Sequence, residues 1–111
     1  MEIGRGDLVV AAFAGDYGKP RPALVAQSDA FAGLESVTLL PLTTDLRNWP
    51  LFRVSVEPTR ENGLRQRSDV MVDKAATMSR NKIGRSIGRL DPATMQAIDT
   101  ALANFLGFGL D

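Results

Sequence analysis

The sequence predicts a mainly β fold: a small, strongly curved antiparallel β-barrel that carries one helix at its C-terminus. Two observations lead to this prediction. Short apolar or alternating segments follow one another between turn-forming residues up to Leu90, and the segment after Asp91 has apolar side chains at helical spacing. The 111 residues, 44% of them hydrophobic, are sufficient for one core, so residues 1–111 are expected to form a single domain.

Six segments have the pattern of strands: residues 7–13, 22–27, 37–42, 51–57, 69–75 and 84–90. Residues 22–27 are almost continuously apolar, which indicates a buried strand. Residues 51–57 alternate between apolar and polar side chains, which indicates a half-buried strand. Residues 29–31, in the connection after the second strand, are expected to form one helical turn. The glycines in residues 84–90 allow a bend or a bulge.

The last element is predicted to be a helix that starts after Asp91 and stops at Gly107. Asp91 suits the N-cap because its carboxylate accepts backbone hydrogen bonds, and Pro92 suits the first helical position. Glycine favours helix termination. Five apolar residues recur on one face of this helix and are expected to pack in the core: Met95, Ile98, Leu102, Phe105 and Leu106.

The composition excludes several kinds of functional site. The chain has no histidine and no cysteine, so Ser-His-Asp and Cys-His nucleophiles are excluded and a zinc site would need carboxylates alone. No metal and no cofactor are therefore expected. The N-terminus lacks the apolar run of a signal peptide, and no segment reaches the ~20 apolar residues of a membrane helix. We therefore expect a cytoplasmic protein that does not contact membranes.

Basic residues are concentrated in one part of the chain. The whole chain has 13 basic and 13 acidic residues, whereas residues 60–89 contain eight basic residues against three acidic ones, a net charge of +5. Such a segment could face a nucleic-acid backbone or form a solvated face of the domain.

Arg21 is the best candidate for phosphate chemistry. It stands between Pro20 and Pro22, where a loop becomes a strand, and each proline fixes its own φ and keeps the preceding residue out of the helical region. A guanidinium group is planar and permanently charged, and it therefore suits bidentate contact with phosphate. A surface arginine that keeps the strand edge soluble would account for the same pattern.

Several segments, taken in order, resemble the MazF/PemK toxin ribonucleases. They are Arg5–Val9, Gly18–Val25, Val37–Thr44, Glu61–Leu64, Asp69–Asp73, and Gly88–Leu90 with the helix that follows. None of them is specific alone, but their order and spacing extend the resemblance over nearly the whole chain. The resemblance implies an SH3-like barrel, a homodimer, and metal-independent cleavage of single-stranded RNA to 2′,3′-cyclic phosphate and 5′-hydroxyl ends. It also implies a cognate antitoxin whose tail covers the RNA groove.

The same resemblance implies that Arg21 and Thr43 are the catalytic residues. Arg21 is expected to stabilise charge on the phosphorane, and whether it also donates a proton stays open. Thr43 would bond a phosphate oxygen, or else only its own backbone as strand-end threonines do, and Thr44 is the adjacent alternative. Many family members carry a Glu-Gln pair in the loop before the Arg-Pro step. Here the loop is Asp16–Lys19, so either of its end residues, or neither, takes that role.

Further RNA contacts are expected from Lys19, Thr44, Arg47, Trp49 and Arg85. Trp49 could stack on an unpaired base, pack at a dimer interface or cover the end of the barrel. Arg85 could touch a phosphate or point outward from its strand.

Two other functions are open on the same fold. A CcdB-like gyrase poison would act through its C-terminal residues, and this chain ends in the apolar tail Phe105–Asp111. A non-catalytic SH3-like binding module would need no reactive residues. The RNA cleavage motif, which we expect to depend on residues 14–20 and 45–51, and the identity of the antitoxin do not follow from the sequence.

Overall fold

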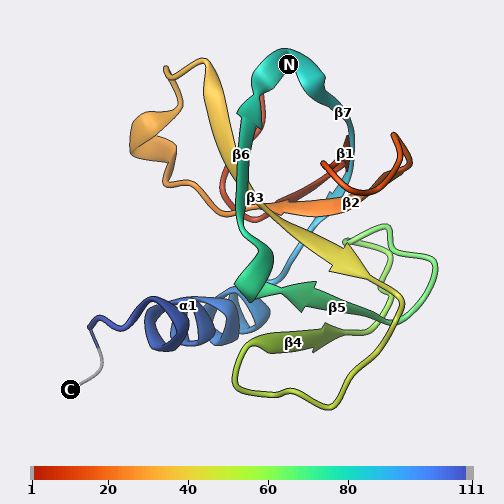
Figure 1. Ribbon diagram of the computed structural model, residues 1–111, viewed down its shortest axis with the longest axis vertical. Coiled ribbons are helices and arrows are strands. Elements are labelled where there is room, and N and C mark those ends of the chain that lie inside the picture. The colour runs from red at the N-terminus through yellow and green to blue at the C-terminus, as the bar shows by residue number, and fades with distance from the viewer. Residues whose placement is uncertain (1, 110–111) are drawn as a thin grey trace.

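The computed structural model describes residues 2–109, which form a mainly β fold with a C-terminal helix (Figure 1). The strands are β1 (Asp7–Ala12), β2 (Pro20–Val25), β3 (Ser36–Thr43), β4 (Arg53–Val56), β5 (Ser68–Met71), β6 (Ala76–Ser79) and β7 (Ile83–Arg89). Three 3-10 turns, η1 (Asp29–Phe31), η2 (Val72–Lys74) and η3 (Arg80–Lys82), and the helix α1 (Pro92–Leu106) complete the elements. The last two residues of the apolar tail, Leu110 and Asp111, lie outside the described residues. Within residues 2–109 every helix falls short of the length and hydropathy that a membrane crossing needs.

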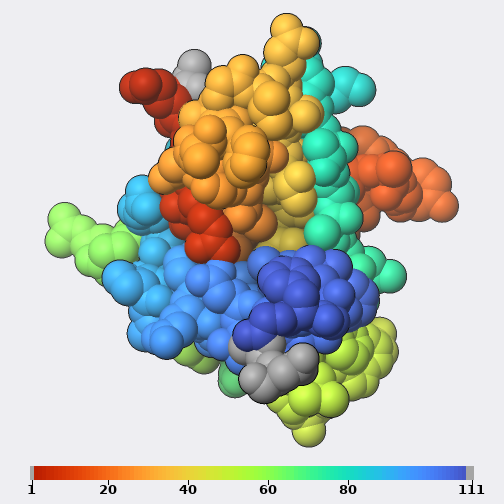
Figure 2. Space-filling model, turned by 90° about the vertical axis from the view of Figure 1, so that its left-hand side faces the viewer, coloured from red at the N-terminus to blue at the C-terminus, as the bar shows by residue number. Residues whose placement is uncertain are grey.

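The strands form one antiparallel sheet in the order β4-β5-β3-β2-β1-β7. β3 pairs with two further strands besides β2: its first half pairs with β6, and its last residues pair with β5 on the edge away from β2. The sheet curves strongly around the core, and α1 lies across its open end beside η2 and β4 (Figure 1). The space-filling view shows the same arrangement, with blue α1 packed against the yellow-green segment around β4 (Figure 2). The predicted fold class is confirmed.

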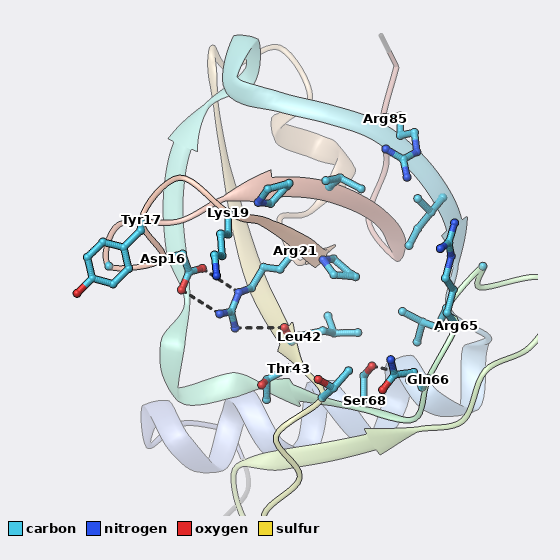
Figure 3. Close-up of a pocket in the computed structure, with 18 residues that line it drawn as sticks. Asp16, Tyr17, Lys19, Arg21, Leu42, Thr43, Arg65, Gln66, Ser68 and Arg85 are labelled. Atoms are coloured by element: carbon cyan, nitrogen blue, oxygen red, sulfur yellow. Dashed lines mark hydrogen bonds and ion pairs between the residues drawn. The ribbon is translucent and has the colours of Figure 1, made fainter.

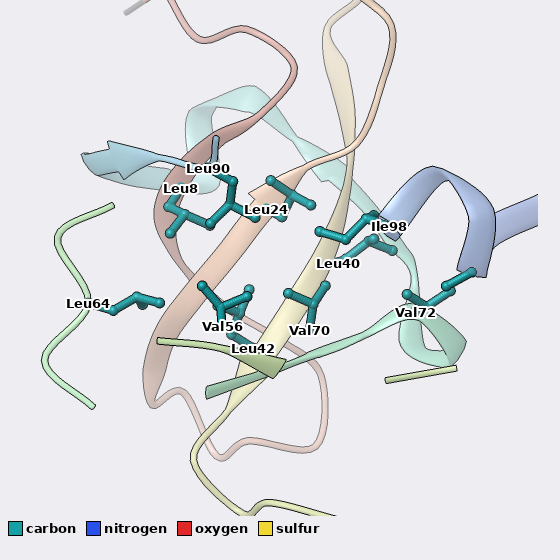
Figure 4. Packing of buried hydrophobic residues seen from close by; sticks show 11 residues of the cluster. Leu8, Leu24, Leu40, Leu42, Val56, Leu64, Val70, Val72, Leu90 and Ile98 are labelled. Carbon is teal, nitrogen blue, oxygen red and sulfur yellow. The ribbon is translucent and has the colours of Figure 1, made fainter. Parts of the chain in front are cut away.

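The central strands β1, β2 and β3 are buried on both faces. On one face Leu8, Leu24 and Leu40 pack with Ile98 of α1 and with residues of β4 and β5 (Figure 4). On the other face a second cluster contains Val9, Ala11, Ala23, Val25, Val37, Leu39 and Ile83. Because neighbouring residues of a strand point to opposite faces, burial on both faces explains the continuous apolar run that marked residues 22–27.

Residues 69–75 do not form one strand, contrary to the prediction. β5 ends at Met71, and the chain turns into η2 because the fully buried Val72 is drawn into the core beneath α1. This turn moves the chain along the edge of β3 to the strand β6, which the sequence analysis missed. β6 is short, and its Ala-Thr-Met-Ser sequence has little apolar alternation to reveal it.

The ends of α1 are as predicted. The Asp91 carboxylate accepts the backbone N–H of Thr94 at 3.2 Å, Pro92 opens the helix, and Gly107 closes it with a φ of +80°. The helical turn predicted at residues 29–31 is also present, as η1.

The apolar stripe of α1 is only partly in the core. Ile98 is fully buried, whereas Phe105 and Leu106 are 50% and 60% exposed, so the prediction that they are core residues is wrong. The reason is geometric: α1 extends beyond the sheet, and nothing in the described chain packs over its last turn (Figure 1). With Phe108, which is 59% exposed, they form an apolar patch at the helix end.

The segment Glu61–Leu64 belongs to the loop between β4 and β5 and packs against β7, the strand at the other end of the sheet order. Its Glu61 carbonyl accepts the backbone N–H of Arg89, the last residue of β7, at 3.0 Å. Asn62 is 3% exposed, and its side chain makes three hydrogen bonds: its oxygen accepts two backbone N–H groups at 3.0 Å, and its amide donates to the Glu57 carbonyl at 2.9 Å. A buried amide with all these partners fixes the path of the loop after β4.

Gly63 is required by a close backbone contact. It has a φ of +70°, and a Cβ there would lie 2.0 Å from the Ile87 carbonyl oxygen of β7. Gly63→Ala should lower the free energy of unfolding by roughly 2–4 kcal/mol, because it adds a backbone clash to the strain of a left-handed alanine. Urea denaturation measures this change.

Two matched alanine variants separate the two costs. Gly15 also has a positive φ, +90°, but a Cβ there would meet open space, so Gly15→Ala should lower the free energy of unfolding by only about 1–2 kcal/mol. At Gly33 there is neither a positive φ nor a close contact, so the free energy of unfolding of Gly33→Ala should stay within about 0.5 kcal/mol of the wild type. Equal stability of Gly63→Ala and Gly33→Ala would contradict the role of the contact.

Candidate active site

The candidate site lies where β2 and β3 separate. The two strands pair along Ala23–Val25 of β2 and no further. Towards its start β2 keeps only its pairing with β1, through Pro20, while the end of β3 turns to pair with β5. The edge of β2 that contains Arg21 is therefore open on one side, and a groove begins there.

Pro22 explains why the pairing stops. The backbone polar groups of Val25 point towards β1, because its carbonyl accepts the N–H of Gly6 at 2.9 Å. Successive residues of a strand point these groups to opposite sides, so those of Leu24 and Pro22 point towards β3. The next ladder position in the register would place Pro22 opposite Leu42. Proline has no N–H to donate there, so the ladder ends and the Leu42 carbonyl is left without its strand partner.

Arg21 occupies this gap. Its Nη1 donates to the Leu42 carbonyl at 3.4 Å, while its Nε and Nη2 lie 2.8 and 2.9 Å from the two carboxylate oxygens of Asp16 (Figure 3). The Arg21 side chain is 31% exposed and that of Asp16 is 20% exposed. A bidentate pair at partly buried side chains holds the guanidinium plane in one orientation.

The guanidinium group of Arg21 retains hydrogen-bonding capacity. It has five N–H groups, and Asp16 and Leu42 use three of them, which leaves one on each terminal nitrogen. These two N–H groups form a second fork, suited to an anion with two oxygens.

Thr43 and Thr44 follow directly on the Leu42 carbonyl and line the same groove. The Thr43 hydroxyl accepts the backbone N–H of Asp45 at 3.1 Å, which fixes the side chain at the end of β3. The hydroxyl proton is still available to donate, because that hydrogen bond uses only a lone pair. Thr44 is more exposed than Thr43.

The groove has a volume of about 660 Å³ and a positive lining. Its walls are the β1–β2 loop, the start of β2, the end of β3, the segment before β5, and β7 (Figure 3). Four basic side chains against one acidic side chain give the lining a net charge of +3: Lys19, Arg21, Arg65 and Arg85 against Asp16. Lys19, Arg65 and Arg85 have no ion-pair partner among the described residues. Three cations are thus available to a polyanion around the fixed guanidinium of Arg21.

The structure brings together most of the residues that the sequence singled out. Arg21, Thr43, Thr44, Lys19 and Arg85 all line the groove, and Asp16 is the residue of the β1–β2 loop that contacts Arg21.

Arg47 and Trp49 lie elsewhere. They line a second hollow of about 420 Å³ beside α1, where Trp49 stacks on Phe52 with a centroid distance of 5.4 Å. The Arg53 guanidinium lies 5.0 Å from the Trp49 ring centroid and that of Arg47 lies 5.4 Å away. Arg47 also pairs with Asp45 at 3.0 Å, and its hydrogen bond and charge lower the pKa of that carboxyl. Trp49 therefore lies outside the groove that contains Arg21.

Sequence reasoning did not assign three polar residues to the groove: Arg65, Gln66 and Ser68. All three follow Glu61–Leu64, whose docking on β7 brings them to the groove, so that segment was the available signal. Tyr17 belongs to the loop of residues 14–20 that was expected to influence the cleavage motif. Only two basic residues of the segment 60–89 line the groove, Arg65 and Arg85. Among residues 2–109, no cluster of three or more carboxylates is arranged to hold a metal ion.

Comparison with known proteins gives a consistent result. A family model described as PemK-like, MazF-like toxin of type II toxin-antitoxin system matches residues 4–106. The probable endoribonuclease MazF of Mycolicibacterium smegmatis is 44% identical over 104 residues, which covers 93% of this chain and 95% of that protein. A mycobacterial endoribonuclease solved in complex with its cognate antitoxin has a TM-score of 0.83 at 27% identity, over 99% of this chain and 100% of that one. The Mycobacterium tuberculosis toxin MazF-mt6 has a TM-score of 0.80 at 28% identity, over 94% and 99%.

Proposed function

The chain belongs to the PemK-like, MazF-like toxin family of type II toxin-antitoxin systems, as an endoribonuclease, and we propose that it cuts single-stranded RNA without a metal, with Arg21 and Thr43 as its catalytic residues. The observation that carries this proposal is the Arg21 guanidinium, held by Asp16 beside Thr43 in a positive groove. The relatives that match the chain over almost its whole length are named endoribonucleases, so neither a gyrase poison nor a non-catalytic module is retained.

The proposed reaction uses the nucleophile that RNA itself carries. The 2′-oxygen attacks the adjacent phosphorus as its proton passes to solvent, the bond to the 5′-oxygen breaks, and that oxygen takes up a proton. The products are a 2′,3′-cyclic phosphate and a 5′-hydroxyl. Two negative charges develop on the equatorial oxygens of the phosphorane, and stabilising them is the main task of the protein.

Arg21 is suited to this task because its free fork presents one N–H from each terminal nitrogen. Two parallel hydrogen bonds to the phosphorane oxygens become stronger as charge develops on these oxygens. The Thr43 hydroxyl donates a further hydrogen bond and fixes the phosphate relative to the fork. A guanidinium is a poor general base because its pKa lies above about 12, so charge stabilisation is the role that its chemistry favours.

Asp16 acts in this proposal as a positioning residue for Arg21. Both of its carboxylate oxygens contact the guanidinium, at 2.8 and 2.9 Å, so its charge is already engaged. It therefore takes the place that the Glu-Gln pair has in other members, while Lys19 stays free to contact the RNA backbone.

The proposed partners follow from charge and apolar surface. A cognate antitoxin with an acidic tail would suit the groove lining of net charge +3, and a homologue of known structure is bound to its cognate antitoxin. A second copy of the chain would cover the exposed patch of Phe105, Leu106 and Phe108, and sedimentation at micromolar concentration tests this homodimer. We place the protein in the cytoplasm, where mRNA is the substrate.

Purified protein should cut an unstructured RNA in excess EDTA and leave 2′,3′-cyclic phosphate ends, because the groove supplies charge stabilisation from side chains alone. Mass spectrometry of the products identifies the ends. An RNA with a 2′-deoxy sugar at the cut site is the control and should stay intact, since its nucleophile is missing. Cleavage that stops in EDTA and returns with Mg²⁺ would exclude this mechanism.

Arg21→Ala should lower the single-turnover cleavage rate by on the order of 10²-fold or more, the scale of a lost transition-state stabiliser. Arg21→Lys should also be strongly impaired, because a point charge cannot form the fork. Thr43→Ala should slow cleavage more than Thr44→Ala. Lys82→Ala, which removes an exposed cation outside the groove, is the matched control and should cut at the wild-type rate. The free energy of unfolding should change by no more than about 1 kcal/mol in the threonine and Lys82 variants. It should fall by no more than about 3 kcal/mol in the Arg21 variants, which leave the buried Leu42 carbonyl without a donor. Near wild-type cleavage rates for both Arg21 variants would show that Arg21 has no catalytic role.

A peptide with the acidic sequence of the cognate antitoxin tail should compete with an uncleavable RNA for the groove, because both would neutralise the same cations. Fluorescence anisotropy of labelled RNA during titration with the peptide measures the competition. The Arg65→Ala variant should bind both more weakly, whereas Lys82→Ala should bind both as the wild type does. Simultaneous binding with unchanged affinities would place the antitoxin elsewhere on the protein.

A further inference from the structure

Tyr17 has two unusual properties for a tyrosine. It is 98% exposed, at the tip of the β1–β2 loop, and its φ of +54° makes it the one non-glycine residue among 2–109 with a positive φ. Left-handed backbone is unfavourable for a bulky side chain. Because the side chain is almost fully exposed, packing against the rest of the described chain does not compensate for this conformation.

The loop is nevertheless well defined by two consecutive turns. The Asp16 N–H donates to the Phe13 carbonyl at 3.1 Å, and the Lys19 N–H donates to the Asp16 carbonyl at 3.0 Å. In the second turn both central residues, Tyr17 and Gly18, have positive φ, as in a type I′ turn, whose first central position usually holds Asn, Asp or Gly. A tyrosine at this corner is a departure from the expected turn chemistry, and such departures concentrate at functional positions.

The position of Tyr17 connects it to the candidate active site. Asp16, its direct neighbour, closes the turn with its backbone and holds Arg21 with its carboxylate. Tyr17 itself lines the groove and lies at its outer end, beyond the Asp16–Arg21 pair (Figure 3). The loop stands clear of the body of the molecule as an orange projection in Figure 2, so the ring is accessible from the solvent.

We propose that Tyr17 stacks on an unpaired base that flanks the scissile phosphate and so holds the RNA strand in register with Arg21. This inference rests on the proposed function. A strand whose phosphate is bound at Arg21 passes the β1–β2 loop, where its neighbouring base meets the exposed aromatic ring of Tyr17. Stacking suits an exposed tyrosine because every base has a flat apolar face, and the cations around it bind the backbone. The turn fixes the backbone at Tyr17 and therefore the direction in which the side chain leaves the loop, which lowers part of the entropic cost of the contact.

A double-mutant cycle between the protein and the RNA tests this proposal. The wild-type cut site is first mapped on an unstructured RNA, and oligonucleotides are then made with an abasic nucleotide at each position around it. Single-turnover rates are measured for the wild type, Tyr17→Phe and Tyr17→Asn. Tyr17→Phe keeps the ring, whereas Tyr17→Asn removes the ring and keeps the turn, because asparagine accepts the left-handed conformation.

The wild type and Tyr17→Phe should each lose roughly 5- to 100-fold in rate at one abasic position next to the cut, the range of a lost base–aromatic stack. Tyr17→Asn should be slower on intact RNA by a similar factor and insensitive to the abasic nucleotide at that position alone. Wild-type rates for Tyr17→Asn, or unchanged sensitivity at every abasic position, would overturn the proposal. Unchanged cleavage by Tyr17→Asn together with weaker binding of the antitoxin peptide would assign the ring to the partner interface and overturn it as well. If the wild type cuts no RNA, the proposed function fails and the role of Tyr17 fails with it, whereas cleavage that ignores Tyr17 refutes only this inference.

Discussion

Pro22 cannot donate a backbone hydrogen bond, and because of its position in β2 this missing donor determines where the groove opens. Because Pro22 faces β3, the ladder between the two strands ends beside it and the Leu42 carbonyl loses its partner. The side chain of Arg21 takes that position instead, with its Nη1 on the Leu42 carbonyl. One missing N–H therefore separates the strands, brings a cation to the gap and places that cation next to the threonines at the end of β3.

The Asp16–Arg21 pair couples the shape of the loop to the chemistry of the groove. Asp16 is a turn residue through its backbone and an ion-pair partner through its side chain, so any change in the loop also changes the orientation of the guanidinium. The same turn presents Tyr17. A short loop can therefore combine the positioning of Arg21 with a contact to the RNA, and variation in its sequence would alter RNA binding and catalytic geometry together.

Local physical rules explain what the sequence could predict. The apolar run of β2 and the caps of α1 depend on neighbouring residues, and both features are found in the structure. The contacts that organise the groove depend on distant segments. Arg65 reaches it because Asn62 and Gly63 dock on β7, and neither charge nor periodicity carries that information. The same limit explains Phe105, because a helical stripe shows which face is apolar but not where the sheet beneath it ends.

The charge distribution bears on how a partner is selected. The chain has no net charge, so it exerts little long-range attraction on a polyanion. The groove lining has a net charge of +3, and at physiological salt its field extends about 8 Å, roughly the size of the groove itself. Attraction then acts mainly on a strand already close to the groove, and RNA that meets other faces is not retained. Under these conditions contacts with individual bases weigh more in the choice of substrate, because the non-specific electrostatic contribution is small. A neutral protein with one local cluster of cations is thus better suited to selective than to indiscriminate cleavage.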